Sequence, residues 1–260
     1  MREWNAESYH RISNPMFAMA MPVLERLRLS GNELVLDVGC GSGLVTEQVL
    51  ERIPSGRCVA IDVSMNMLLT ARDHLRPSHG QHVSFVHADA AALPFDRVAD
   101  AIFSTATFHW ALDHPALFGS LFRSLKPGGR LVAQCGGGPN IRRLRDRASA
   151  LMNEPEFAPY FAAWRRPWEF ADAETTSGRL QAAGFKDIET SVEPTPVVHS
   201  DAEAFATYLT DIVCRAHLAC LPTTELRERF VHRLTILAAS DPIPFELDYW
   251  RLNIDATRPR

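Results

Sequence analysis

The stretch LDVGCGSGLVTE, residues 36–47, decides the fold of this chain. Its three glycines, Gly39, Gly41 and Gly43, follow an apolar run and precede a segment with apolar residues at intervals of four. That order predicts a strand, a glycine turn and a helix. Because glycine has no Cβ atom, the backbone can turn tightly there and a ligand can approach it closely. We therefore expect a cofactor site at this turn.

The carboxylate of Asp37, two residues before the first glycine, indicates the charge of that cofactor. Dinucleotide sites use a GxGxxG turn with the pyrophosphate at the N-terminus of the following helix. Here the spacing is GxGxG, and an acid beside a pyrophosphate would cost about 1–4 kcal/mol at about 4 Å. Asp37 therefore favours a ligand that carries positive charge, and an NAD-dependent oxidoreductase is the alternative enzyme class.

The strand and helix pattern repeats along the first half of the chain. We expect strands within residues 33–39, 56–64, 83–89, 99–108 and 128–136, the last introduced by the turn KPGG. Helices are expected between them, with Ser64 as the N-cap of the second. This alternation predicts a doubly wound, mainly parallel α/β sheet of seven strands with helices on both faces.

The second half of the chain departs from this alternation. We interpret residues 1–260 as one domain with a helical cap at 1–30, in which Pro22 limits the first helical segment, and a cofactor-binding core at 31–136. Helical insertions at 137–184 and 197–240 are expected to form a lid over the site, and 185–196 and 243–256 supply the final strands. Ser200 and Glu203 are spaced as a capping box that opens one long helix. The partner helix that follows Pro222 places Leu226, Phe230, Leu234 and Leu237 on one face.

Four ordered motifs carry a family resemblance. The stretches VLDVGCGSG (35–43), AIDVSMNML (60–68), HADAAALPF (87–95) and LKPGGRLV (125–132) resemble the motifs of the Rossmann-like, class I S-adenosylmethionine-dependent methyltransferases. The similarity covers about residues 30–136. FHW at 108–110, the N-terminal WNAESYHRISNP and the final YWRLNIDATRP are similar to the methyltransferase type 11 or trans-aconitate methyltransferase-like branch.

The resemblance implies S-adenosyl-L-methionine as cofactor and S-adenosyl-L-homocysteine as product. The residue matching Asp62 would hold the ribose hydroxyls, the one matching Asp89 would recognise the adenine edge, and Asp37 would orient the ammonium group directly or through water. The full set of residues expected at the cofactor is Asp37, Gly39, Cys40, Gly41, Gly43, Asp62, Val63, Met67, Asp89, Ala90, Thr105, Tyr9 and His10.

The reacting end is expected where the fourth strand ends. His109 is the candidate catalytic base if the acceptor is a hydroxyl or an amine, and an oriented wall residue is the other interpretation. A carboxylate acceptor is already ionised at pH 7, so it would need no base. The residues expected to contact the substrate are His109, Trp110, Trp164 and Arg165.

We therefore predict a methyltransferase that acts on a small molecule. The favoured acceptor atom is an oxygen, such as that of a carboxylate. A catalytically silent S-adenosylmethionine-binding subunit is the alternative outside the enzymes. The sequence suggests no metal site, and a homodimer is possible.

Composition narrows the partners and the location. The 27 Lys and Arg against 31 Asp and Glu give a net charge of −4, which offers a nucleic acid no general attraction. The five cysteines form no CxxC pair, as expected for thiols in a reducing cytoplasm. The N-terminus lacks an apolar signal region, and no stretch of about 18 uncharged apolar residues occurs, so we expect neither secretion nor a membrane span.

Overall fold

The computed structural model describes residues 14–260, which form two compact units. The first contains residues 14–138, 168–193 and 251–260, and the second contains residues 139–167 and 194–250. The segment 168–184, expected within the lid, instead belongs to the first unit, where its helix α8 (Ala173–Ala183) packs against α5 (His114–Ser124). The first segment of the second unit therefore ends at residue 167, whereas the sequence predicted an insertion that extends to residue 184.

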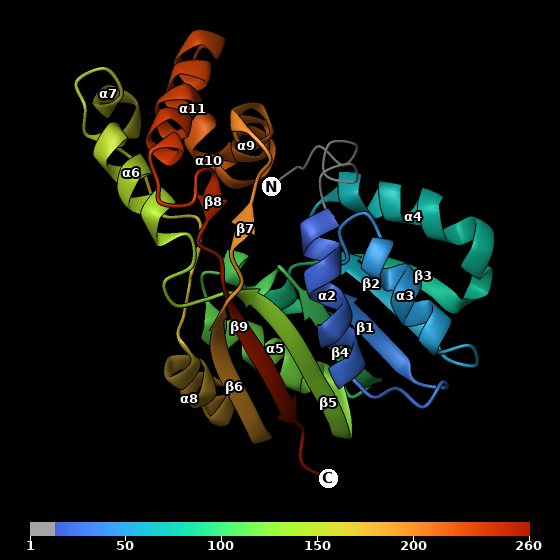
Figure 1. The fold of residues 1–260 in the computed structure, drawn as a ribbon. Helices are drawn as coiled ribbons and strands as arrows, with labels where there is room; N and C mark the ends of the chain where they lie inside the picture. Colours follow the sequence, from blue (N-terminus) through green and yellow to red (C-terminus); the bar gives the residue numbers. More distant parts are fainter. Residues whose placement is uncertain (1–13) are drawn as a thin grey trace. The chain divides into compact units, whose positions relative to one another are not determined.

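A seven-stranded sheet forms the centre of the first unit (Figure 1). Its strands lie in the order β3-β2-β1-β4-β5-β9-β6, and the first five pair in parallel while β9 runs antiparallel to β5. This confirms the predicted doubly wound sheet. The bounds are β1 Leu34–Val38, β2 Arg57–Asp62, β3 Val83–His87, β4 Ala99–Thr105, β5 Leu125–Gly136, β6 Lys186–Pro194 and β9 Trp250–Thr257.

Helices cover both faces of this sheet because each helix buries one apolar stripe. On one face α2 (Asn14–Arg26), α3 (Leu44–Arg52) and α4 (Met65–His79) pack into one apolar core, while α5 and α8 contribute to the core of the other face (Figure 1). Side chains cap the N-termini of three of these helices, one of them at the predicted Ser64. Ser64, Asp113 and Asp172 each accept a hydrogen bond from a backbone amide of the first turn.

Two local predictions in this unit were wrong. Helix α2 continues through Pro22, because burial of the adjacent Val23 and Leu24 offsets the missing backbone hydrogen bond of an exposed proline. The turn KPGG lies inside β5 rather than before it. The register with β4 shifts there, from Ala99 opposite Leu125 to Ala101 opposite Arg130. A bulge of this kind lets a turn sequence remain within a strand.

The second unit consists of helices and a small two-stranded sheet (Figure 1). Its strands β7 (Val197–Val198) and β8 (Glu246–Leu247) pair in an antiparallel arrangement. Its helices are α6 Arg142–Met152, α7 Ala158–Phe161, α9 Ala202–Tyr208, a π-helix Leu209–Val213, α10 Arg215–Leu218 and α11 Thr224–Ala239.

Three predictions for this unit need correction. Asp201, not Ser200, caps α9 by accepting from the Ala204 amide at 2.8 Å, because a carboxylate interacts more favourably with the helix N-terminus. The single long helix expected from residue 200 is interrupted by the π-helix. Leu237, expected on the buried face of the partner helix, is exposed, and α11 buries Val231 instead.

The expected final strand at 243–256 is also divided. Glu246–Leu247 pairs with β7, and β9 begins only at Trp250. A tight turn in which the Tyr249 amide donates to the Leu247 carbonyl at 2.8 Å separates the two strands. The alternating apolar pattern runs across both strands, so the break has no signature in the hydrophobic periodicity.

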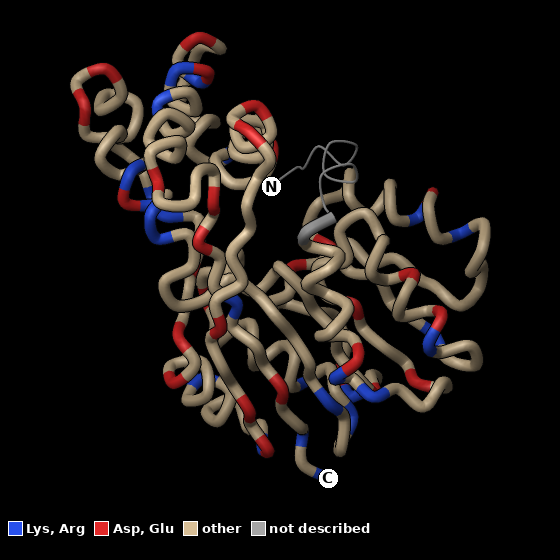
Figure 2. Tube along the Cα trace, viewed as in Figure 1, with Lys and Arg blue, Asp and Glu red and all other residues tan. Residues whose placement is uncertain are grey.

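Figure 2 shows basic positions along α6, and two of its arginines, Arg143 and Arg147, form ion pairs within the second unit. Arg143 contacts Glu246 at 2.5 Å and Asp241 at 3.6 Å, and Arg147 also pairs with Asp241. These contacts join α6 to the segment that contains β8. We therefore assign a structural role to Arg143.

None of the helices within residues 14–260 combines the length and the apolar character that crossing a membrane requires. All five cysteines, each of which lies in this part of the chain, are free thiols, and four of them are buried. This agrees with the sequence-based expectation of buried, unpaired thiols.

His217 is expected to make the stability of the second unit depend on pH. Its ring is 5% exposed and stacks on Trp164 at 4.5 Å, and burial lowers its pKa to about 4. In the unfolded chain the pKa is about 6.5, so a fall in pH adds a proton to the unfolded state first. The neutral His217 ring therefore costs no stability above about pH 6.5. Below that pH it lowers the free energy of unfolding, by about 2 kcal/mol at about pH 5.

Urea unfolding of the wild type and of His217→Phe at pH 7.5 and pH 5 measures this contribution. The variant should lose about 2 kcal/mol less than the wild type on acidification. An identical pH dependence in the two proteins would show that His217 does not contribute in this way.

Candidate active site

The candidate site lies where the strand order of the sheet reverses. Strands β1, β2 and β3 extend to one side and β4 and β5 to the other, so β1 and β4 are the adjacent pair at the switch point. Ligands of open α/β sheets bind beyond the carboxyl ends of the strands at such a point. The glycine loop follows β1 directly, and the segment containing His109 follows β4.

The loops after β1 and β4 are in close contact at Gly39. The Thr107 hydroxyl donates to the Gly39 carbonyl at 3.4 Å and to the Thr105 carbonyl at 2.9 Å. Gly39 has φ +82°, and a Cβ atom at this position would lie 2.0 Å from Thr107 Oγ1. Position 39 thus requires glycine both for its conformation and for its space.

Backbone hydrogen bonds attach the glycine loop to the neighbouring strand β2. The amides of Gly39 and Cys40 donate to the Ile61 carbonyl at 2.8 and 2.9 Å. The Gly41 amide donates to the Asp62 carboxylate at 3.0 Å, and the Ser64 amide donates to its other oxygen at 2.8 Å. The Asp62 carboxylate is therefore held in one orientation at the end of β2.

Asp37 and Asp62 form a pair of acids beneath the glycine loop. Asp37 is 2% exposed, and Thr46 Oγ1 donates to its carboxylate at 2.6 Å. Burial raises the pKa of Asp37 to about 7 against the opposing effect of the Thr46 bond, and the negative charge of Asp62 raises it further. Burial also raises the pKa of Asp62, although the amides of Ser64, Gly41 and Val63 act in the opposite direction. A cation near this pair would relieve its mutual repulsion.

The remaining residues expected at the cofactor differ in exposure. Asp89 is exposed and caps a short 3₁₀ helix (Ala90–Ala92) by accepting from the Ala91 amide at 2.9 Å. Val63 is exposed, whereas Cys40 and Met67 are buried, Met67 on the sheet side of α4. Thr105 ends β4. Tyr9 and His10 lie outside the described residues.

His109 lies in a 3₁₀ helix (Phe108–Trp110) just beyond β4 and is 8% exposed. Its Nδ1 atom accepts from the Gly136 amide at 3.3 Å, and its carbonyl accepts from the Glu169 amide at 2.8 Å. Its ring packs against those of Trp110 and Phe170, with centroid distances of 5.1 and 5.5 Å. His109 and Trp110 are thus together in the first unit, in an aromatic environment.

A network that the sequence did not predict holds the His109 segment in place. The buried His114 contacts the Phe108 carbonyl through Nε2 at 3.2 Å and accepts from Arg179 at 2.7 Å through Nδ1. Arg179 also pairs with Glu169 at 3.0 Å. Burial and the Arg179 charge lower the pKa of His114, which favours the neutral ring that this arrangement needs. Because His114 and Arg179 are 65 residues apart, no local motif signals the contact.

Arg251 is a second residue that the sequence analysis missed. It is 3% exposed, and its Cα pairs with Gly136, whose amide contacts His109. Its guanidinium donates to the thioether sulfurs of Met16 and Met19 at 3.0 and 3.1 Å. The sequence contains one signal for it, because Arg251 is the single basic residue in the largely apolar stretch that begins the last strand.

The other residues expected at the substrate, Trp164 and Arg165, belong to the second unit. Trp164 is partly buried by its stacking on His217, and Arg165 is exposed. Their contact with the substrate stays a prediction. Residues 14–260 hold no group of three or more His, Cys, Asp or Glu side chains placed to bind a metal ion.

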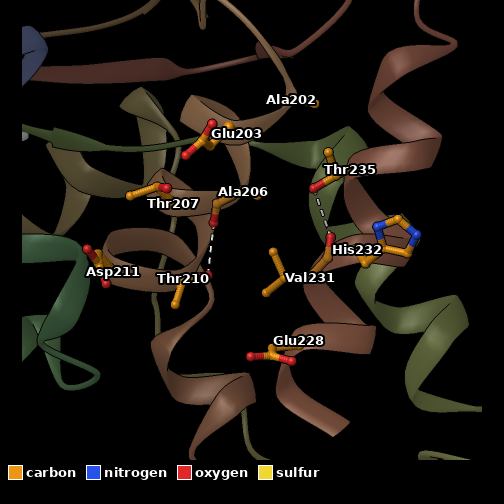
Figure 3. Close-up of a pocket in the computed structure, with 10 residues that line it drawn as sticks. All are labelled: Ala202, Glu203, Ala206, Thr207, Thr210, Asp211, Glu228, Val231, His232 and Thr235. Atoms are coloured by element: carbon orange, nitrogen blue, oxygen red, sulfur yellow. Dashed lines mark hydrogen bonds between the residues drawn. The ribbon is translucent and has the colours of Figure 1, made fainter. Parts of the chain in front are cut away.

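A separate pocket of about 460 Å³ lies in the second unit between α9, the π-helix and α11 (Figure 3). Two of its hydroxyl groups are used within their own helices, since Thr210 donates to the Ala206 carbonyl and Thr235 to the Val231 carbonyl, each at 2.9 Å. The other polar lining groups include the acids Glu203, Asp211 and Glu228. The pocket contains none of the residues expected at the cofactor or the acceptor.

A doubly wound sheet with an antiparallel strand beside β5, a glycine loop at the switch point and an acid at the end of β2 define the class of the Rossmann-like methyltransferases. Residues 35–129 match the family model described as a methyltransferase domain. The chain belongs to the class I S-adenosylmethionine-dependent methyltransferases.

Among curated relatives, the chain is 31% identical over 196 residues to the trans-aconitate 2-methyltransferase of Paracidovorax citrulli, covering 75% of this chain and 69% of that protein. It is 34% identical over 166 residues to the protein of the same name from Methylobacterium nodulans, covering 63% and 61%. The chain thus spans less than two thirds of the length of the Methylobacterium relative.

Solved structures show the same fold. The phosphoethanolamine N-methyltransferase 2 of Haemonchus contortus, solved with S-adenosyl-L-methionine, has a TM-score of 0.64 at 19% identity, covering 98% of this chain and 57% of that chain. The YcgJ protein of Bacillus subtilis has a TM-score of 0.63 at 15% identity, covering 96% and 99%.

The contact between the two loops predicts that Gly39→Ala is strongly destabilising. The new methyl group would overlap the Thr107 side chain at a backbone conformation that alanine disfavours. We expect a loss of at least about 2 kcal/mol in the free energy of unfolding, measured by urea denaturation.

Gly119→Ala on α5 is the matched control, because a Cβ atom there meets no atom within 4 Å. In a helix interior this change should be neutral or stabilising by up to about 1 kcal/mol. Equal stability of the two variants would show that Thr107 can move away from position 39.

Proposed function

We propose that the chain transfers a methyl group from S-adenosyl-L-methionine to a carboxylate oxygen of a small organic acid in the cytoplasm. The observation that supports the cofactor most strongly is the acid pair at the switch point, formed by the buried Asp37 and the partly buried Asp62. The names of the curated relatives and the buried guanidinium of Arg251 support an acid as the acceptor. The alternative of an NAD-dependent oxidoreductase lacks support, because the family is that of methyltransferases.

The residues at the switch point fit a cationic nucleoside. A ligand with an ammonium and a sulfonium group would be attracted to two neighbouring carboxylates, whereas a pyrophosphate would be repelled by them. The Asp62 carboxylate accepts the amides of Gly41 and Ser64, and because a carboxylate has about four lone-pair sites it keeps acceptor capacity for a ribose hydroxyl. In this proposal Asp37 orients the ammonium group, Asp89 and Ala90 meet the adenine, and Tyr9 and His10 close the methionine end.

When bound, S-adenosyl-L-methionine supplies a methyl group that forms a bond to the acceptor oxygen as the carbon–sulfur bond breaks and leaves its electron pair on sulfur. A carboxylate acceptor releases no proton in this step, so the chain needs to supply alignment and a dry pocket rather than a strong base. The buried ring of His109 packs against the partly buried rings of Trp110 and Phe170, and in this proposal the three form an aromatic wall that limits the access of water. Arg251, at the same end of the sheet, supplies positive charge for an anionic acceptor.

Asp37 should couple cofactor binding to proton release. Its pKa is about 7, so at pH 6 it is mostly protonated, and a cationic ligand favours its ionised form. Affinity should therefore rise from pH 6 to pH 8, with a proton released on binding below pH 7. Calorimetry in buffers of different ionisation enthalpy measures that proton.

Asp37→Asn is the control, because its side-chain oxygen can still accept from Thr46 while its charge cannot change. At pH 6 the amino group of the ligand is protonated both free and bound, so the difference in proton release between the two proteins at this pH isolates Asp37. Equal proton release by the two proteins would place the titrating group elsewhere.

A transfer assay tests the activity itself. Methyl-tritiated S-adenosyl-L-methionine is incubated with the chain and with trans-aconitate, other di- and tricarboxylates, monocarboxylates, phenols and amines. We expect label in a base-labile methyl ester of a polycarboxylate. Cofactor binding with no transfer to any member of the panel would instead support the silent binding subunit.

Arg251→Met should raise the KM for that acid by about 10- to 150-fold. This range corresponds to the loss of a charge-assisted hydrogen bond worth about 1.5–3 kcal/mol. Arg251→Lys keeps the charge and should lose less. An unchanged KM in Arg251→Met, with cofactor affinity intact, would remove Arg251 from the acceptor site.

A further inference from the structure

His109 is held on both sides of its peptide as well as through its ring. The Phe108 carbonyl contacts His114, the His109 carbonyl accepts from Glu169, and Nδ1 accepts from Gly136. The ring also packs against Trp110 and Phe170. With its backbone and one ring nitrogen fixed, the ring has little freedom to rotate or to exchange its two nitrogens.

The contact with Gly136 determines which nitrogen carries the proton. A backbone amide can only donate, so Nδ1 must present its lone pair to the Gly136 amide at 3.3 Å. A neutral imidazole has one protonated and one unprotonated nitrogen, and the hydrogen bond at one nitrogen selects the form of the other. The proton of neutral His109 is therefore on Nε2.

This proton position decides what His109 can do in the reaction. A general base needs a lone pair directed at the proton that it removes. The lone pair of neutral His109 is at Nδ1, where it is directed at a backbone amide, and Nε2 can only donate. His109 is thus arranged to give a hydrogen bond to an oxygen and not to take a proton from one.

We propose that His109 binds the acceptor as an Nε2–H hydrogen-bond donor that orients a carboxylate oxygen, and that it is not a general base. The inference rests on the proposed function, since it takes a carboxylate as the acceptor. It also narrows the acceptor, because a phenol or an amine would need a proton acceptor that His109 does not provide. Trp110 and Phe170, which are partly buried, pack against the ring and strengthen such a hydrogen bond by limiting its contact with water.

Gly136 acts here as a positioning residue through its main chain. It is the last residue of β5, and its pairing with Arg251 of β9 fixes the direction of its amide. The donor at His109 and the guanidinium of Arg251 are therefore linked to the same residue of the sheet. This places a neutral donor and a positive charge at one end of β5 and β9, as a bound carboxylate would require.

Three substitutions at position 109 distinguish a donor from a base. Glutamine places an amide near the position of Nε2, where it can donate but cannot accept a proton, whereas asparagine places its amide near Nδ1 and leaves the Nε2 position empty. We expect His109→Gln to keep kcat/KM for the acid within about tenfold of the wild type. His109→Asn and His109→Ala should both fall by about 30-fold or more, with cofactor affinity unchanged in all three.

Two kinetic outcomes overturn the inference. If His109→Gln is as inactive as His109→Ala while both bind the cofactor normally, the reaction needs a proton acceptor at this position. If His109→Ala is as active as the wild type, the ring is only part of the wall.

Nitrogen-15 NMR of the histidine-labelled protein tests the tautomer without any acceptor, with His109→Gln to assign the signal. We expect Nδ1 unprotonated and Nε2 protonated at pH 7.5. A proton on Nδ1 overturns the inference even in an enzyme that esterifies acids. If the wild type has the expected tautomer but esterifies no acid, the proposed function is overturned instead. A carboxylate is then not the partner of the Nε2–H donor.

Discussion

The close contact between the loops after β1 and β4 is the constraint on which the rest of the site depends. Thr107 occupies the space that any side chain at position 39 would need, and its hydroxyl reaches the Gly39 carbonyl. The contact fixes the glycine loop relative to the segment that carries His109. Because the cofactor and the acceptor would lie on these two segments, their separation is set by packing inside the protein before either molecule binds.

The electrostatics of the site follow from the same arrangement. The loop that Gly39 opens donates through Gly41 to Asp62, and Asp62 in turn raises the pKa of the buried Asp37. Two acids in a region of low exposure are unfavourable for the empty protein and become favourable when a cation is present. In the proposed function, the unfavourable proximity of these two acids favours the binding of a positively charged ligand.

In the proposed function, the acceptor side carries the opposite charge. Segment 108–110 is held by His114, Arg179 and Glu169. The Gly136 amide determines which nitrogen of neutral His109 carries the proton. Arg251 brings a buried positive charge to the same end of β5. A negative region beside one strand end and a positive one beside another match a methyl donor that is a cation and an acceptor that is an anion. In this proposal, methyl transfer between a cationic donor and an anionic acceptor needs neither a metal ion nor a strong base.

The sequence by itself determined the features that depend on neighbouring residues. The strand and helix alternation, the glycine loop, the caps Ser64, Asp113 and Asp172, and the acid Asp62 at a strand end all have local signatures. Local signals failed where two were in competition, as at Ser200 beside Asp201, or where a pattern ran unbroken across a turn, as between β8 and β9. Only the tertiary structure decided that Arg179 meets His114 and that Arg251 lies opposite Gly136. These contacts join residues far apart in the chain, and they depend on strand register and helix packing, which hydrophobic periodicity does not specify.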